Sequence, residues 1–124
     1  PQQCWLQPTV EAGRAATAEL LNQHPADRPD ALLASNGLLL LGAAQAIQSA
    51  GLQMPHDIGL AGFDNNDWTT LPALDVTVIE QPTYEIGRTA AELLLQRLAE
   101  PTRPVRSVVL EGRLLARGST RRGG

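Results

Sequence analysis

Short apolar segments alternate with longer segments of helical periodicity along this chain, and this alternation constrains the fold more than any other feature. The apolar segments are 31–34, 58–63 and 76–79. The helical segments are 10–23, 38–50 and 83–98. Continuous apolar runs of this length suit strands that are buried on both faces of a parallel sheet. The alternation therefore predicts an α/β fold with a mostly parallel sheet.

Several local signals refine this prediction. Thr9 and Asn36 are expected N-caps of the first two helices, and Gly51 is the expected residue just past the end of the second. The second helix begins with four consecutive leucines, so we expect it to be covered on more than one side. Further strands are predicted at 1–7, 108–110 and 114–116.

Polar residues follow the predicted strands at the edge where ligands bind in open α/β sheets. These residues are Ser35, Asn36, Asp64, Asn65 and Gln81. A carboxylate accepts hydrogen bonds from two neighbouring hydroxyls, and side-chain amides both donate and accept, so the set suits a sugar. The simpler interpretation is that Asn36 only caps a helix and that Asp64 only makes a turn.

Composition and motifs give little sign of catalysis or of direct DNA binding. The formal net charge is −3, which argues against this segment holding DNA by itself. The carboxylates of Asp64 and Asp67 have no evident catalytic partner, and His24 and His56 lack metal-ligand spacing. We expect no enzyme activity, no cofactor and no metal, and no apolar run reaches the roughly 18 residues of a membrane span.

Three stretches together resemble the C-terminal half of LacI-family transcriptional repressors. They read PDALLASNGLLLLGAAQAIQSAGLQMPHDIGLAGFDN, LDVTVIEQPTYEIGRTAAELLLQRL and VVLEGRLLARGST. The resemblance extends from about Pro29 to Thr120, and its motifs are specific in combination. Within the family, ASNGLLLLGA, GFDN and VIEQPTYEIGR look most like the members that respond to 2-ketogluconate.

The resemblance implies a periplasmic-binding-protein-like (type I) fold with an effector in the cleft between two subdomains. It implies that Asn36, Asp64 and Gln81 bind effector hydroxyls. Many members have a stacking aromatic before the first helix, where this chain has Pro8 instead. Trp5 or Trp68 is then the candidate replacement, and Trp68 fits a subunit interface equally well.

The same resemblance implies a homodimer and a particular division of the chain. The implied interface residues are Leu38, Leu41, Gln45, Trp68 and Leu71, and for those on the helix ordinary core packing is an equally open alternative. Residues 1–82 and 105–120 correspond to the C-terminal subdomain. The helix at 83–100 corresponds to one that packs on the N-terminal subdomain. We expect this segment alone either to expose the face of Ile86, Leu94 and Leu98 or to cover it by dimerising or by packing elsewhere. We expect that subdomain and the helix-turn-helix that binds operator DNA to lie outside this chain, which begins at Pro1.

The sequence thus predicts the effector-sensing part of a cytoplasmic DNA-binding regulator, with a small sugar or sugar acid as its ligand. A periplasmic sugar-binding protein of a transporter shares this fold and is the main alternative. An α/β enzyme is a third, but it would require a nucleophile, metal or cofactor motif that the sequence does not show.

Overall fold

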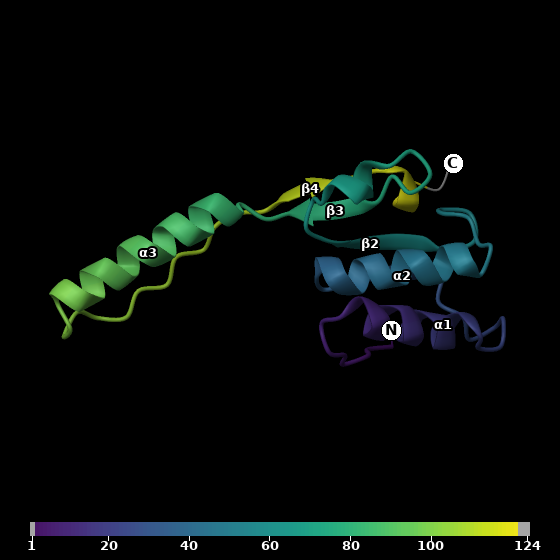
Figure 1. Ribbon diagram of the computed structural model, residues 1–124, viewed down its shortest axis with the longest axis horizontal. Helices are drawn as coiled ribbons and strands as arrows, with labels where there is room; N and C mark the ends of the chain where they lie inside the picture. The colour runs from purple at the N-terminus through teal and green to yellow at the C-terminus, as the bar shows by residue number, and fades with distance from the viewer. Residues whose placement is uncertain (1, 122–124) are drawn as a thin grey trace.

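A four-stranded sheet with two helices stacked on one side forms the body of the protein, and a third helix leaves this body as an arm (Figure 1). The computed structural model describes residues 2–121. The helices are α1 (Val10–Leu21), α2 (Gly37–Ser49) and α3 (Thr83–Ala99), and the short 3-10 helices are η1 (Asp67–Thr70) and η2 (Gly118–Thr120). The strands are β1 (Ala31–Leu33), β2 (Gly59–Phe63), β3 (Thr77–Glu80) and β4 (Arg113–Leu115).

The sheet has the order β1-β2-β3-β4. The first three strands are parallel, and β4 pairs with β3 in the antiparallel direction. The prediction of a mostly parallel sheet is therefore confirmed, and strands and helices begin within a few residues of the predicted positions. The expected caps are confirmed too: Oγ1 of Thr9 accepts a hydrogen bond from the Ala12 amide at 3.1 Å, and Gly51 has a φ of +69°.

Two predicted strands are wrong. Within the described part of segment 1–7, residues 2–7 form no strand, and Trp5 is 93% exposed. Residues 108–110 also form no strand, although Val108 to Leu110 is apolar. A strand requires a neighbouring strand to pair its backbone, and residues 108–110 run back along α3 instead (Figure 1).

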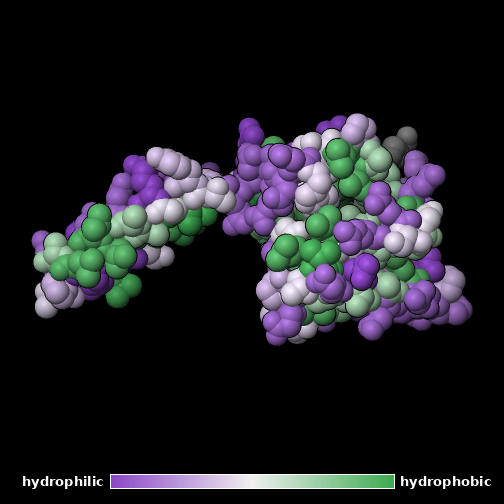
Figure 2. Space-filling view, in the orientation of Figure 1, coloured by the Kyte–Doolittle hydropathy of each residue, from purple (hydrophilic) through white to green (hydrophobic). Residues whose placement is uncertain are grey.

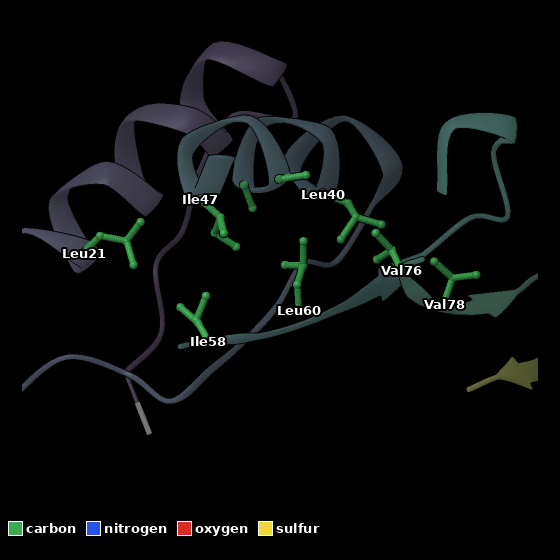
Figure 3. Packing of buried hydrophobic residues seen from close by; sticks show 9 residues of the cluster. Leu21, Leu40, Ile47, Ile58, Leu60, Val76 and Val78 are labelled. Carbon is green, nitrogen blue, oxygen red and sulfur yellow. The ribbon is translucent and has the colours of Figure 1, made fainter. Parts of the chain in front are cut away.

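The core lies between α2 and the sheet, and α1 packs on the outer side of α2 (Figure 3). The labelled residues in Figure 3 are Leu21, Leu40, Ile47, Ile58, Leu60, Val76 and Val78. All of these side chains are buried. As predicted, α2 is covered on two sides, but Leu38 at its start is 52% exposed.

Glycines allow α1 and α2 to approach very closely. A Cβ on Gly42 would lie 2.2 Å from the carbonyl oxygen of Val10, and a Cβ on Gly13 would lie 2.6 Å from that of Leu39. Both neighbours are backbone atoms, which cannot rotate away as a side chain can. The two glycines therefore set the distance between α1 and α2.

The end of the described chain is fastened to the sheet by a buried hydroxyl. Oγ of Ser119 donates to the carbonyl oxygen of Leu60 at 2.5 Å and accepts from the amide of Thr77 at 2.8 Å. Oδ2 of Asp75 accepts from the amide of Gly118 at 2.7 Å. These bonds join η2 to β2 and β3, so the residues after β4 form part of the body.

We call residues 83–112 the arm: it comprises α3 and the segment that returns alongside it to β4. No residue of α3 is buried, and Leu94 and Leu98 are 59% and 68% exposed. Figure 2 shows hydrophobic residues gathered on the arm. Of the two outcomes expected for this face, the single chain shows exposure. Among the described residues, no helix combines the length and apolar character that crossing a membrane requires.

Candidate ligand-binding site

Three residues predicted for the site, Asn36, Asp64 and Gln81, come together where β1, β2 and β3 end. Oδ2 of Asp64 accepts the amide hydrogen of Gly37 at 3.0 Å. Oδ1 of Asp64 accepts from Nε2 of Gln81 at 2.8 Å. The Asp64 carboxylate therefore joins the start of α2 to the residues that lead into α3.

The backbone of Asp64 is in the left-handed region, with a φ of +75°. This conformation is uncommon for a residue other than glycine and occurs often at binding sites. The amide of Asp64 still donates to the carbonyl oxygen of Ile79 at 3.1 Å, so the strand pairing continues up to the turn. The turn directs the side chain toward Gly37, where the two groups meet.

The residue at position 37 must be small because the site is crowded there. A Cβ on Gly37 would lie 2.8 Å from Nδ2 of Asn66 and 3.2 Å from Oδ2 of Asp64. Asn66 therefore belongs to the cluster, although sequence reasoning did not assign it to the site. Its position in a polar loop gave no local signal, because its proximity to Gly37 depends on how β2 pairs with β1.

Asn36 has the capping role that the simpler interpretation gave it. Its Oδ1 accepts from the amides of Leu38 at 3.1 Å and Leu39 at 3.0 Å. Its Nδ2 has no hydrogen bond within the described residues 2–121, so this donor is available to a ligand. One side chain can thus cap α2 and still contribute to the site.

The arrangement offers a mixed set of hydrogen-bonding groups to a ligand. Asn36 and Asp64 are half-buried, and Gln81 is exposed. A carboxylate has about four lone-pair positions, and the Asp64 carboxylate uses two of them in the bonds described above. Two acceptor positions remain beside amide groups that both donate and accept. This combination suits a ligand with neighbouring hydroxyl groups.

The two candidate stacking residues lie in different surroundings. Trp5 is in the extended segment before α1 and is almost fully exposed. Trp68, in η1, is half-buried and packs against the hydrophobic core. Ligand stacking by either residue stays a prediction. Among the predicted interface residues, Leu38 and Leu71 are 52% and 51% exposed, Gln45 is exposed, and Leu41 is half-buried.

Next to the site lies a polar network that sequence reasoning missed. Nη2 of Arg117 donates to Oδ1 of Asn65 at 2.6 Å, and Nδ2 of Asn65 donates to Oε1 of Glu80 at 2.8 Å. Nη2 of Arg113 donates to Oε2 of Glu80 at 2.9 Å. Hydrogen bonds from Asn65 and Arg113 hold the pKa of Glu80 below its ordinary value. The network lies along β3: Glu80 pairs with Arg113 at the start of β4, and Arg117 lies two residues after the end of β4.

Comparison with known proteins identifies the family to which this arrangement belongs. Residues 2–120 match the periplasmic binding protein-like domain. The HTH-type transcriptional regulator PtxS of Pseudomonas aeruginosa is 40% identical over 92 residues, which are 74% of this chain and 27% of that regulator.

Solved structures agree with the sequence match. A LacI family transcriptional regulator from Enterococcus faecium with bound ribose has a TM-score of 0.75 and 32% identity, covering 93% of this chain and 41% of that one. A LacI family regulator from Arthrobacter in complex with lactose has a TM-score of 0.75 and 31% identity, covering 94% and 43%. The chain spans between 27% and 33% of the length of the first curated regulators it matches.

Proposed function

The chain belongs to the periplasmic binding protein-like domain family, in the form found in LacI-family transcriptional regulators, and on that premise we propose that it senses a small sugar or sugar acid. Binding of this effector changes the affinity of the whole regulator for its operator DNA. An effector can do so only if it binds one conformation more tightly than another.

The observation that carries this proposal is the Asp64 carboxylate, which is held by Gly37 on one side and Gln81 on the other. Both contacts fix its orientation and leave two acceptor positions for hydroxyl hydrogens. Nδ2 of Asn36 supplies a donor close to the same strand ends. A site built for hydroxyl groups rejects ligands that lack them, because each buried unpaired group costs about 1–3 kcal/mol.

The bound ligands of the two similar structures, ribose and lactose, support a sugar as the effector class. Within that class we propose 2-ketogluconate as the sugar acid to test, on the strength of the motifs around Asn36, Asp64 and Gln81. Its carboxylate requires a cation, which we expect from a part of the regulator that precedes this segment.

We also propose the assembly in which this domain works. The regulator is a homodimer in the cytoplasm, and it binds operator DNA through a helix-turn-helix outside the present segment. The half-exposed Leu38 and Leu71 support a subunit interface at the start of α2 and after η1, together with Leu41, Gln45 and Trp68. The proposed role is binding and signalling, without catalysis.

The proposed division of the chain follows the arm. Residues 1–82 form one subdomain with the segment after the arm, and the apolar helix predicted at 83–100 packs on a second subdomain. The sequence-based division assigned 105–120 to the first subdomain. Residues 105–112 lie in the arm, so we now propose that they accompany α3, while residues 113–120 stay with the body.

Titration calorimetry on the full-length protein tests this function, with ribose first and 2-ketogluconate second. Asp64→Asn keeps the size of the side chain and removes its charge, and Asp67→Asn is the matched control three residues away in η1. We expect saturable heat from the wild type and the control, and at least about tenfold weaker binding by Asp64→Asn. If Asp64→Asn binds as tightly as the wild type, the Asp64 carboxylate does not contribute to ligand binding. Absence of binding across neutral sugars and sugar acids would overturn the sugar-sensor assignment.

A further inference from the structure

We propose that Arg117 is a positioning residue for the ligand site, which holds the Asp64 carboxylate in place through Asn65 without touching the ligand. This inference rests on the proposed function. It assigns a role to the ARGST motif at 116–120, none of whose residues belongs to the candidate site described above. Arg117 lies 53 positions after Asp64 in the sequence.

The guanidinium of Arg117 joins three segments at once. Nη1 donates to Oγ1 of Thr69 in η1 at 2.9 Å and to the carbonyl oxygen of Val76 before β3 at 3.0 Å. Nη2 donates to Oδ1 of Asn65 in the loop after β2 at 2.6 Å. A planar guanidinium with several fixed donors can satisfy these acceptors simultaneously, whereas a lysine ammonium is a single point charge.

Arg117 is itself held firmly enough to act as an anchor. Its amide donates to Oγ1 of Thr77 at 2.8 Å, and the same hydroxyl lies 3.2 Å from the Arg117 carbonyl oxygen. Thr77 is a buried residue of β3. Ser119, two residues after Arg117, is held by buried hydrogen bonds. The anchor is therefore hydrogen-bonded to the buried part of the sheet.

The network includes the chain neighbours of both residues that form the Asp64–Gln81 hydrogen bond. Asn65 directly follows Asp64, and Glu80 directly precedes Gln81. Asn65 and Glu80 are joined by the 2.8 Å bond between Nδ2 and Oε1. The residues flanking the Asp64–Gln81 bond are thus tied to each other, and Arg117 ties them to β3 and η1.

The backbone of Asp64 gives this network a physical task. Its φ of +75° is unfavourable for a residue with a Cβ, so the loop requires contacts that keep it in this conformation. If the loop relaxed, the carboxylate would leave the Gly37 amide and the ligand hydroxyls together. When supporting contacts keep the binding groups in one position, affinity is higher, because less conformational freedom of the protein is lost on ligand binding.

Arg117→Lys in the full-length protein tests the inference, because it keeps the charge and removes the planar set of donors. Arg121→Lys is the matched control, since within residues 2–121 the Arg121 side chain donates to the Ala116 carbonyl oxygen, at 2.9 Å, and to no group of the candidate site. We expect ribose affinity to fall by about tenfold in Arg117→Lys, comparable to the loss of one charge-assisted hydrogen bond, and to stay unchanged in Arg121→Lys.

Hydrogen–deuterium exchange at the Gly37 amide separates a positioning role from a general structural role. If Arg117 only stabilised the fold, its loss would not accelerate exchange selectively at Gly37. This amide donates to Asp64 and lies on a different segment from Arg117. We expect faster exchange at Gly37 in Arg117→Lys and in Asn65→Ala, with wild-type exchange in α1 and in the core of α2. Asn65 is exposed, so Asn65→Ala tests the same link without disturbing the core.

The outcomes separate this inference from the proposed function. If the wild type binds no sugar, the proposed function fails, and selective acceleration at Gly37 still supports the positioning role. If Arg117→Lys and Asn65→Ala bind ribose as the wild type does and leave Gly37 exchange unchanged, the positioning role is overturned. Acceleration spread evenly over the body would also overturn it, because Arg117 would then support the fold as a whole.

Discussion

Nε2 of Gln81 lies 2.8 Å from Oδ1 of Asp64, so the residue that follows β3 is hydrogen-bonded to the residue that follows β2. These two residues are 17 positions apart in the chain, and each directly follows one of two neighbouring parallel strands. The hydrogen bond therefore joins the candidate site to the residues that lead into α3.

Gln81→Met tests the value of this contact, because methionine has a similar length and neither donates nor accepts strongly. We expect ribose affinity to fall by about tenfold, since the polar groups of Gln81 are lost from the site. Stability should change by no more than about 0.5 kcal/mol, because the side chain is exposed. Calorimetry and thermal unfolding measure both, with Gln53→Met at another exposed glutamine as control; equal losses of affinity in both variants would contradict the prediction.

Two substitutions at Asn36 separate its capping role from its ligand role. Asn36→Ala removes the acceptor for the Leu38 and Leu39 amides and should cost about 1 kcal/mol of stability as well as ligand affinity. Asn36→Asp keeps a good capping acceptor but removes the amide donor and adds a charge near Asp64. We expect wild-type thermal stability with weakened ribose binding. Tight binding by Asn36→Asp would show that Asn36 only caps the helix.

Gly42→Ala should disrupt the contact between α1 and α2. The added Cβ would lie 2.2 Å from the Val10 carbonyl oxygen and 2.6 Å from the Arg14 amide nitrogen, so the helices must separate. We expect a loss of about 1–3 kcal/mol in the free energy of unfolding, as for other overpacked sites. Urea denaturation measures it, and Ser49→Ala at the exposed end of the same helix is the control. A stabilised Gly42→Ala variant would mean that α1 and α2 pack further apart.

The network at Glu80 predicts a weak dependence of stability on acid. Because its hydrogen bonds lower the folded-state pKa of Glu80 below the ordinary 4.5, the charged carboxylate stabilises the fold above that pH. This contribution is lost as the pH falls through the folded-state pKa. The difference in melting temperature between wild type and Glu80→Gln should be constant near neutral pH and shrink below about pH 4.5. The difference should be small, because Glu80 and Arg113 are solvent-accessible. A gap that widens in acid would contradict it.

Local patterns predicted most of the secondary structure and the three residues that meet in the candidate site. The Thr9 and Asn36 caps act on backbone amides within three residues, so their role depends on the nearby sequence alone. Asp64 and Gln81 were predicted because parallel strands end at one edge of the sheet, wherever each strand lies in the chain. Asn66 escaped prediction because only the pairing of β1 with β2 brings it to Gly37.

The sequence by itself determined the alternation of strands and helices, because buried strands and amphipathic helices leave periodic patterns in neighbouring residues. Only the tertiary structure decided that Val108 to Leu110 runs along α3 while Arg113 to Leu115 joins the sheet, since the two predicted strands, 108–110 and 114–116, are both short and apolar. It also decided the partners of Arg117, which bonds to Asn65 across 52 positions. A long polar side chain carries no periodic signal, and its partners are chosen by whichever acceptors the folded backbone brings within its reach.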